Sequence, residues 1–255
     1  MAGIRVELND DILSLVFARP EKKNAITDAM YGALADGIVR SDSDSSVRVV
    51  LIRSEGDTFT AGNDITDFAN SGAEPSDKPK NVHRFLRAIA SSSKPIIAAV
   101  QGNAVGVGTT MLLHCDYVVL ADNAALITPF VNLALVPEAA SSLLLPNRIG
   151  HVRAFAMFAL GEPVPAKAAL EWGLANLVVP AAQLEETALA VAQKLAEKPL
   201  SALVATKKLM RDPELAIARM NAEREVFALR LQSVEAKEAF AAFAERRKPD
   251  FRKFR

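Results

Sequence analysis

The stretch KPIIAAVQGNAVGVG, residues 94–108, carries most of the information about the fold. Its first part, Pro95 to Val100, is a short apolar run that predicts a strand. Its second part, Gln101 to Gly108, is a loop of small residues that leads into a segment with a helical pattern. A strand that passes through such a loop into a helix is typical of α/β folds with crossover connections.

A weaker copy of this arrangement occurs upstream. Residues 47–52 predict a strand buried on both faces, and FTAGNDI, residues 59–65, is a second loop of small residues. Around these two units we expect a hairpin, a helix with Thr27 as its N-cap and one more strand. Their ranges are Ile4–Leu8 and Ile12–Phe17 for the hairpin, up to about Arg40 for the helix, and Tyr117–Ala121 for the strand.

From about Pro180 the pattern predicts helices alone. They cover residues 181–197, 199–211, 213–231 and 234–247, with proline or short polar breaks between them. We therefore divide the chain into an α/β core, residues 1–195, and a helical C-terminal region, residues 196–255. These last helices have apolar faces but are too short to enclose a core of their own, so we expect self-association through them.

Charge and composition exclude several classes of function. Lys plus Arg equals Asp plus Glu at 30 each, so the chain has no general attraction for nucleic acid or an anionic membrane. The single cysteine and the three histidines share no ligand spacing, and we expect no metal site. No apolar run approaches the length of a membrane span, and residues 1–11 show no signal pattern. A cytoplasmic location is the default expectation.

Three glycines make the two loops candidate binding sites. Gly62, Gly106 and Gly108 allow a ligand to approach the backbone, and a helix that starts after each loop presents unpaired N–H groups. Two such helix ends would bind a developing oxyanion. The alternative is that these glycines serve tight turns alone. A dinucleotide or phosphate loop is excluded, because the spacing from Gly102 onward matches neither fingerprint.

The chain resembles the enoyl-CoA hydratase/isomerase (crotonase) family over nearly its whole length. The matching stretches, in the family's order, are Ala18-Arg19-Pro20 with Asn24-Ala25-Ile26, residues 59–65, residues 94–108, Cys115-Asp116 and the segment from Pro137. The resemblance implies a spiral of repeated ββα units with a helical C-terminal region that forms trimers or dimers of trimers. It also implies an oxyanion hole made by the backbone N–H groups of Asn63 and Val107. Many family members have glycine where this chain has Val107.

The acids decide which reaction the resemblance implies. Hydratases of the family use two glutamates, whose positions here hold Thr110 and Phe130. Glu138 instead stands where hydratases usually have glycine, and this pattern resembles Δ3,Δ2-enoyl-CoA isomerases of the peroxisomal type. A single carboxylate suffices for moving a double bond, because no water is added. The alternative is structural: an acid after Pro137 would stabilise a helix N-terminus.

The resemblance also indicates where coenzyme A (CoA) would bind. The segment Arg19 to Ala25 resembles the family's strip beside the adenine and phosphates, with Lys22 and Lys23 as candidate phosphate contacts. The predicted CoA-binding residues are Lys22, Lys23, Ala25, Ala61, Gly62, Asp64, Ile65 and Gly106. CoA is part of the substrate, so no separate cofactor is expected. Our interpretation is an enoyl-CoA isomerase with Glu138 as its acid and base. The alternatives are a hydratase, hydrolase or decarboxylase on the same scaffold, and a non-catalytic acyl-CoA-binding subunit.

Overall fold

A six-stranded sheet forms the centre of the protein. The computed structural model describes residues 3–64 and 80–254. The sheet has the order β1-β2-β3-β4-β6-β9 and is parallel apart from the hairpin of β1 and β2, which the sequence predicts. The bounds are Gly3–Asn9, Ile12–Ala18, Val49–Ser54, Ile96–Val100, Tyr117–Ala121 and Leu177–Val179.

A second, three-stranded sheet stands beside the first. It consists of β5 (Asn103–Val105), β7 (Ala125–Ile127) and β8 (Val164–Pro165), with β5 and β7 parallel. Twice the chain leaves a strand of the large sheet, β4 or β6, and enters the small sheet a few residues later. This repetition is the spiral of ββα units that the resemblance implies, and the fold prediction is confirmed.

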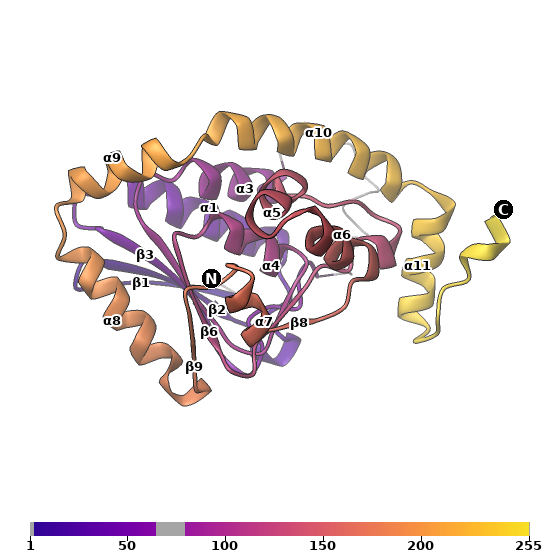
Figure 1. Ribbon diagram of the computed structural model, residues 1–255, viewed down its shortest axis with the longest axis horizontal. Helices are drawn as coiled ribbons and strands as arrows, with labels where there is room; N and C mark the ends of the chain where they lie inside the picture. Colours follow the sequence, from indigo (N-terminus) through magenta and orange to yellow (C-terminus); the bar gives the residue numbers. More distant parts are fainter. Residues whose placement is uncertain (1–2, 65–79, 255) are drawn as a thin grey trace.

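Helices cover both faces of the large sheet (Figure 1). Alternation along the strands sets the two faces: Val50 and Ile52 of β3 belong to the larger core, whereas Val49 and Leu51 pack with α8. The helices are α1 (Asp28–Ser43), α3 (Asn81–Ser91), α4 (Val107–Thr110), α5 (Ser141–Ile149), α6 (His151–Leu160), α7 (Ala166–Glu171), α8 (Leu184–Ala196), α9 (Leu200–Met210), α10 (Pro213–Leu231) and α11 (Val234–Ala244).

The predicted helix boundaries are close to those observed. The Thr27 side chain accepts a hydrogen bond from the Met30 N–H, as an N-cap should. The last helix ends at Ala244 rather than at about residue 247, because Arg246 adopts a left-handed conformation with φ of 55°. No helix within residues 3–64 and 80–254 has the length and apolar character to cross a membrane.

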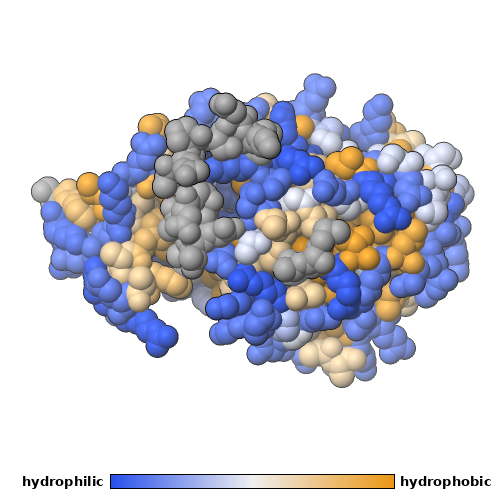
Figure 2. All heavy atoms as spheres, turned by 180° about the vertical axis from the view of Figure 1, so that it is seen from behind, coloured by the Kyte–Doolittle hydropathy of each residue, from blue (hydrophilic) through white to orange (hydrophobic). Residues whose placement is uncertain are grey.

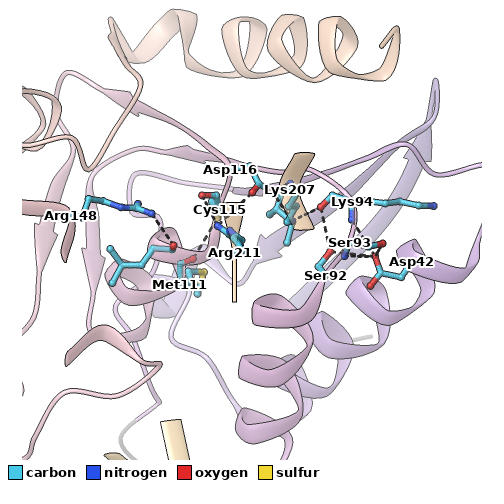
Figure 3. Close-up of polar contacts among 12 residues, drawn as sticks. Asp42, Ser92, Ser93, Lys94, Met111, Cys115, Asp116, Arg148, Lys207 and Arg211 are labelled. Carbon is cyan, nitrogen blue, oxygen red and sulfur yellow. Dashed lines mark hydrogen bonds and ion pairs between the residues drawn. The ribbon is translucent and has the colours of Figure 1, made fainter. Parts of the chain in front are cut away.

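A buried ionic network fixes α9 to the sheet (Figure 3). The Lys207 ammonium donates to the Lys94 carbonyl at 2.6 Å and pairs with Asp116 at 2.7 Å, and its side chain is 8% exposed. Asp116 also accepts the Ile96 N–H at 2.8 Å and lies 3.5 Å from Arg211. The network thus connects the first residues of β4 and β6 to the helix that leads into α10.

We expect Lys207→Met to lower the free energy of unfolding by about 2–4 kcal/mol, because it leaves a carboxylate and a carbonyl without their buried cation. Urea unfolding, followed by circular dichroism at one protein concentration, measures this change. Lys208→Met is the matched control, since Lys208 is the exposed neighbour on the same helix, and it should shift stability by less than about 0.5 kcal/mol. Equal effects of the two substitutions would show that the network contributes nothing.

Candidate active site

The two small-residue loops lie against each other. The Thr60 N–H donates to the Asn103 carbonyl at 3.1 Å, and the Val105 N–H donates to the Thr60 carbonyl at 3.0 Å. A Cβ on Gly62 would stand 2.9 Å from the Val105 carbonyl oxygen, and Gly62 also has a φ of 86°. Glycine is therefore required here both for the backbone conformation and for the close approach of the loops.

Each loop presents a backbone N–H that donates to none of the described residues. On both sides of Asn63 the backbone is tied to Ile26, through bonds of 2.8 Å from Ile26 N–H to Gly62 and 2.9 Å from Asp64 N–H to Ile26. Gly106 donates to the Ile127 carbonyl at 2.8 Å and turns the chain with φ 56° and ψ −116°. Within residues 3–64 and 80–254, neither the Asn63 N–H nor the Val107 N–H donates to a protein acceptor.

The helices expected after the loops need a correction. The helix after the second loop, α4, has four residues and continues as the 3-10 turn Met111–His114. So short a helix has little dipole, so any stabilisation of an anion here must come from the N–H groups themselves. What directly follows the first loop, including the predicted contact Ile65, lies outside the described residues.

The Glu138 carboxylate is hydrogen-bonded to the residue that ends α4, Thr110. The Glu138 Oε1 accepts a hydrogen bond from the Thr110 hydroxyl at 2.7 Å, and Glu138 is half-buried. Burial raises the pKa of the Glu138 carboxyl to about 7; the Thr110 bond lowers it, and the charge of Glu223 raises it. Such a group exchanges its proton near neutral pH, as a general acid and base must.

The acid that binds the N-terminus of α5 is Glu223. The Glu223 carboxylate, 6% exposed and carried by α10, accepts the N–H groups of Ala140 at 2.6 Å and Ser142 at 2.9 Å, at the N-terminus of α5. Ala139 and Ala140 are both left-handed, with φ of 61° and 57°, and this carboxylate holds them there. Within the described residues it is the Glu223 side chain, and not that of Glu138, that accepts the N–H groups at this helix end.

Sequence reasoning did not find Tyr31. Its hydroxyl donates to Asn63 Oδ1 at 2.5 Å, and its ring is 3% exposed. Burial first, and then the charges of Glu138 and Asp28, raise the pKa of Tyr31 well above its ordinary value. The neutral phenol therefore holds the amide oxygen of Asn63 in place.

Six of the residues predicted for CoA lie close together at the first loop. Lys22 and Lys23 are exposed in a 3-10 turn, Pro20–Lys22, and the Lys23 carbonyl accepts the Ala61 N–H at 2.9 Å. Asp64 forms an ion pair with Arg19 at 2.7 Å, and Arg19 also donates to the Ala25 carbonyl. The structure thus brings together the predicted residues Lys22, Lys23, Ala25, Ala61, Gly62 and Asp64. The side chain of Asp64 is engaged, so its part would be steric or through the backbone.

A cavity of about 480 Å³ opens beside these groups. It is lined by Tyr31, Asn63 and Glu138 and, on its other side, by residues of α3 and α10. In the described chain Val107, which is 2% exposed, is not among the lining residues. Phe130, at one of the two positions where hydratases have glutamate, packs its ring against Phe158, with 6.1 Å between the ring centroids.

No group of three or more His, Cys, Asp or Glu side chains among residues 3–64 and 80–254 is arranged to hold a metal ion.

Comparison with known proteins identifies the family. The family model for enoyl-CoA hydratase/isomerase matches residues 7–254. The chain is 32% identical to 1,2-epoxyphenylacetyl-CoA isomerase of Escherichia coli, over 98% of both proteins. It is also 32% identical to enoyl-CoA delta isomerase 2 of Rattus norvegicus, over 96% of this chain and 64% of that protein. Hydratase names occur among the relatives as well.

The similarity extends to three dimensions. A crystal structure of an enoyl-CoA hydratase/isomerase from Pseudoalteromonas atlantica matches with a TM-score of 0.94 and 43% identity, over 98% of this chain and 99% of that one. The sequence motifs, the spiral fold and these matches lead to one conclusion: the chain belongs to the enoyl-CoA hydratase/isomerase family, whose fold is that of crotonase.

Proposed function

We propose that the protein is a Δ3,Δ2-enoyl-CoA isomerase that uses no cofactor beyond the CoA of its substrate. The observation that carries this proposal is Glu138, a half-buried carboxyl with a pKa of about 7 at the cavity wall that also holds Asn63. Three other acids line the cavity, and none combines partial burial with a carboxyl group that is not held by a cation or by amide donors. Asp64 is paired with Arg19, Asp28 accepts two bonds from Asn81, and Glu225 is exposed.

The mechanism that we propose needs one base and one oxyanion site. The thioester oxygen accepts the N–H groups of Asn63 and Val107. Glu138 takes a proton from C2, and the electron pair of the broken C–H bond spreads over the dienolate, with the negative charge mostly on the thioester oxygen. Glu138 then returns the proton to C4, which leaves the double bond between C2 and C3. Neither water nor an oxidant is consumed.

The rival reaction on the same scaffold is hydration. A hydratase needs a second acid to deliver the elements of water, and at the two family positions this chain has the Thr110 hydroxyl, bonded to Glu138, and the buried Phe130. A 3-enoyl-CoA and a 2-enoyl-CoA should therefore be supplied separately, and the products separated by chromatography. We expect conversion of the first to a 2-enoyl-CoA and no 3-hydroxyacyl-CoA from the second. A 3-hydroxyacyl product would favour the hydratase, and tight binding without turnover would favour the non-catalytic subunit.

The charge of Glu223 gives a pH prediction. Because this charge raises the pKa of Glu138, Glu223→Gln should lower that pKa. The acid limb of the kcat profile should then move to lower pH, since the base stays ionised further into acid. The same variant should also lose stability. Glutamine has one side-chain oxygen, so either the Ala140 or the Ser142 N–H would meet the NH₂ group of the amide and lose its acceptor. Lower stability with an unchanged limb would show that Glu223 holds the backbone without tuning the base.

We propose further that residues 196–255 are the oligomerisation region of a trimer or dimer of trimers. Large apolar side chains are exposed along α9, α10 and α11, and Figure 2 shows such side chains at the surface of the face that it draws. They include Leu209, Met210, Leu215, Leu229, Val234 and Phe243. Light scattering at micromolar concentration should give a multiple of three chains, and a monomer would refute this proposal.

A further inference from the structure

The wall of the cavity beyond Glu138 combines an apolar surface with cations. Helices α3 and α10 lie side by side there (Figure 1). Their apolar side chains, among them Val82, Leu86, Ile217, Met220 and Phe227, line the cavity. So do the basic side chains of His83 and Arg87 on α3 and of Arg224 on α10, together with Lys80 just before α3. A plain hydrocarbon chain would pack against the apolar side chains of this wall and form no favourable interaction with the basic ones.

Arg224, Lys80 and Arg87 each lie close enough to His83 to affect its charge. The pKa of the half-buried His83 is lowered, first by burial and then by the charges of Arg224, Lys80 and Arg87. At neutral pH the imidazole is therefore uncharged, and the positive field around it comes from both helices. The lowered pKa of His83 agrees with the position of the two arginines in the cavity wall: Arg87 is on α3, the helix of His83, and Arg224 is on α10.

The cavity's own acids do not neutralise the two arginines. Asp64 pairs with Arg19, Asp28 accepts from Asn81, and Glu138 accepts from Thr110. Glu225 also lines the cavity, on the same helix as Arg224. Within residues 3–64 and 80–254, neither Arg87 nor Arg224 has a carboxylate within ion-pair distance. Two arginines at the same cavity wall that form no ion pair with a described carboxylate can bind an anionic ligand.

We propose that Arg87 and Arg224 bind a carboxylate at the far end of the acyl chain, so that the preferred substrates are CoA monothioesters of unsaturated dicarboxylic acids. The guanidinium group suits this role, because it offers a planar pair of donors that matches a carboxylate. The placement of the acyl chain in this cavity rests on the proposed function, since it follows from the thioester lying between Asn63 and Glu138. The CoA phosphates are the other source of negative charge that these arginines could meet.

Binding of saturated thioesters tests the proposal independently of catalysis. Calorimetry should compare adipyl-CoA, which ends in a carboxylate, with hexanoyl-CoA, and then the two corresponding pantetheine thioesters, which lack the nucleotide phosphates. We expect the protein to bind the adipyl thioester more tightly in both series. The double variant Arg87→Gln, Arg224→Gln should lose about 10- to 100-fold in affinity for the adipyl thioesters and little for the hexanoyl ones.

Arg84→Gln is the matched control, because Arg84 is an exposed arginine on the same helix that pairs with Asp36. It should leave all four affinities unchanged. The proposal is overturned if the double variant weakens both CoA thioesters equally and spares both pantetheine thioesters, because the arginines then bind the CoA phosphates. It is also overturned if wild-type protein does not prefer the adipyl group. Selective binding without isomerisation of 3-hexenedioyl-CoA would instead remove the proposed reaction and leave the carboxylate subsite standing.

Discussion

Replacing Glu138 by glutamine is expected to abolish isomerisation and leave acyl-CoA binding nearly intact. Glutamine keeps the volume and can still accept the Thr110 hydroxyl, whose bond to Glu138 measures 2.7 Å, but it cannot take up and return a proton. Loss of a general base costs ~10²–10⁴-fold in rate, and the upper end applies here because one group serves both transfers. Single-turnover conversion of a 3-enoyl-CoA measures the rate, and calorimetry measures the affinity.

The pH dependence of the wild-type enzyme belongs to the same prediction. The pKa of the Glu138 carboxyl is about 7 in the folded protein, above its ordinary value of 4.5. The base is active when ionised, so kcat should fall as the pH drops through about 7. Glu138→Gln should remove this limb from whatever rate remains. A rate close to that of the wild type would require another base, and Asp64, tied to Arg19, would be the next to test.

Stability offers an independent check on the same carboxyl group. Because its folded pKa is raised, the folded state binds more protons than the unfolded state between pH 4.5 and about 7. The contribution of Glu138 to stability therefore falls as the pH rises through this window, and above it the buried charge is fully destabilising. Glu138→Gln should thus raise the melting temperature at pH 8 relative to wild type, and have little effect at pH 4. A melting temperature that drops equally at both values would show a purely structural role.

Local sequence pattern accounts for the parts of the site that lie on single loops. The apolar runs predicted the strands, and the glycines at 62, 106 and 108 marked the two loops; of these three, Gly62 makes a close backbone approach to the other loop, whereas a Cβ on Gly106 would meet open space. The family resemblance selected Glu138, from the segment that begins at Pro137. Each of these signals is contained in fewer than about ten consecutive residues, where strand and turn preferences act directly.

The remaining features depend on how distant segments dock. Glu223 reaches the N–H groups of Ala140 and Ser142 because α10 packs on α5. A signal for it was present, since Ala216, Met220 and Glu223 form the buried stripe of α10 and an acid in such a stripe needs a partner. Tyr31 meets Asn63 across 32 residues, and no local rule connects the two. The cation cluster likewise forms only once α3 and α10 are side by side.

Removing the N–H of Val107 is the most direct test of the proposed oxyanion site. Val107→Pro should lower kcat by ~10²–10³-fold, the usual cost of one oxyanion donor. Proline is tolerated at the first position of a helix, which Val107 occupies in α4. A residue that precedes proline must avoid helical backbone angles. Gly106 has φ 56° and ψ −116°, which is the mirror image of an extended conformation. These angles are open to glycine and are compatible with a proline at position 107.

The contrast with Val107→Ala makes this test specific. Alanine keeps the N–H and changes the side chain, so it should retain most of the activity at some cost in stability, because Val107 is 2% exposed. Asn63→Ala should behave similarly, since its N–H stays and the Tyr31 hydroxyl loses its acceptor. Asn63 and Glu138 line the cavity, whereas Val107 is not among its described lining residues. If Val107→Pro and Val107→Ala had equal rates, the thioester oxygen would be held by Asn63 without Val107, and the second loop would serve packing alone.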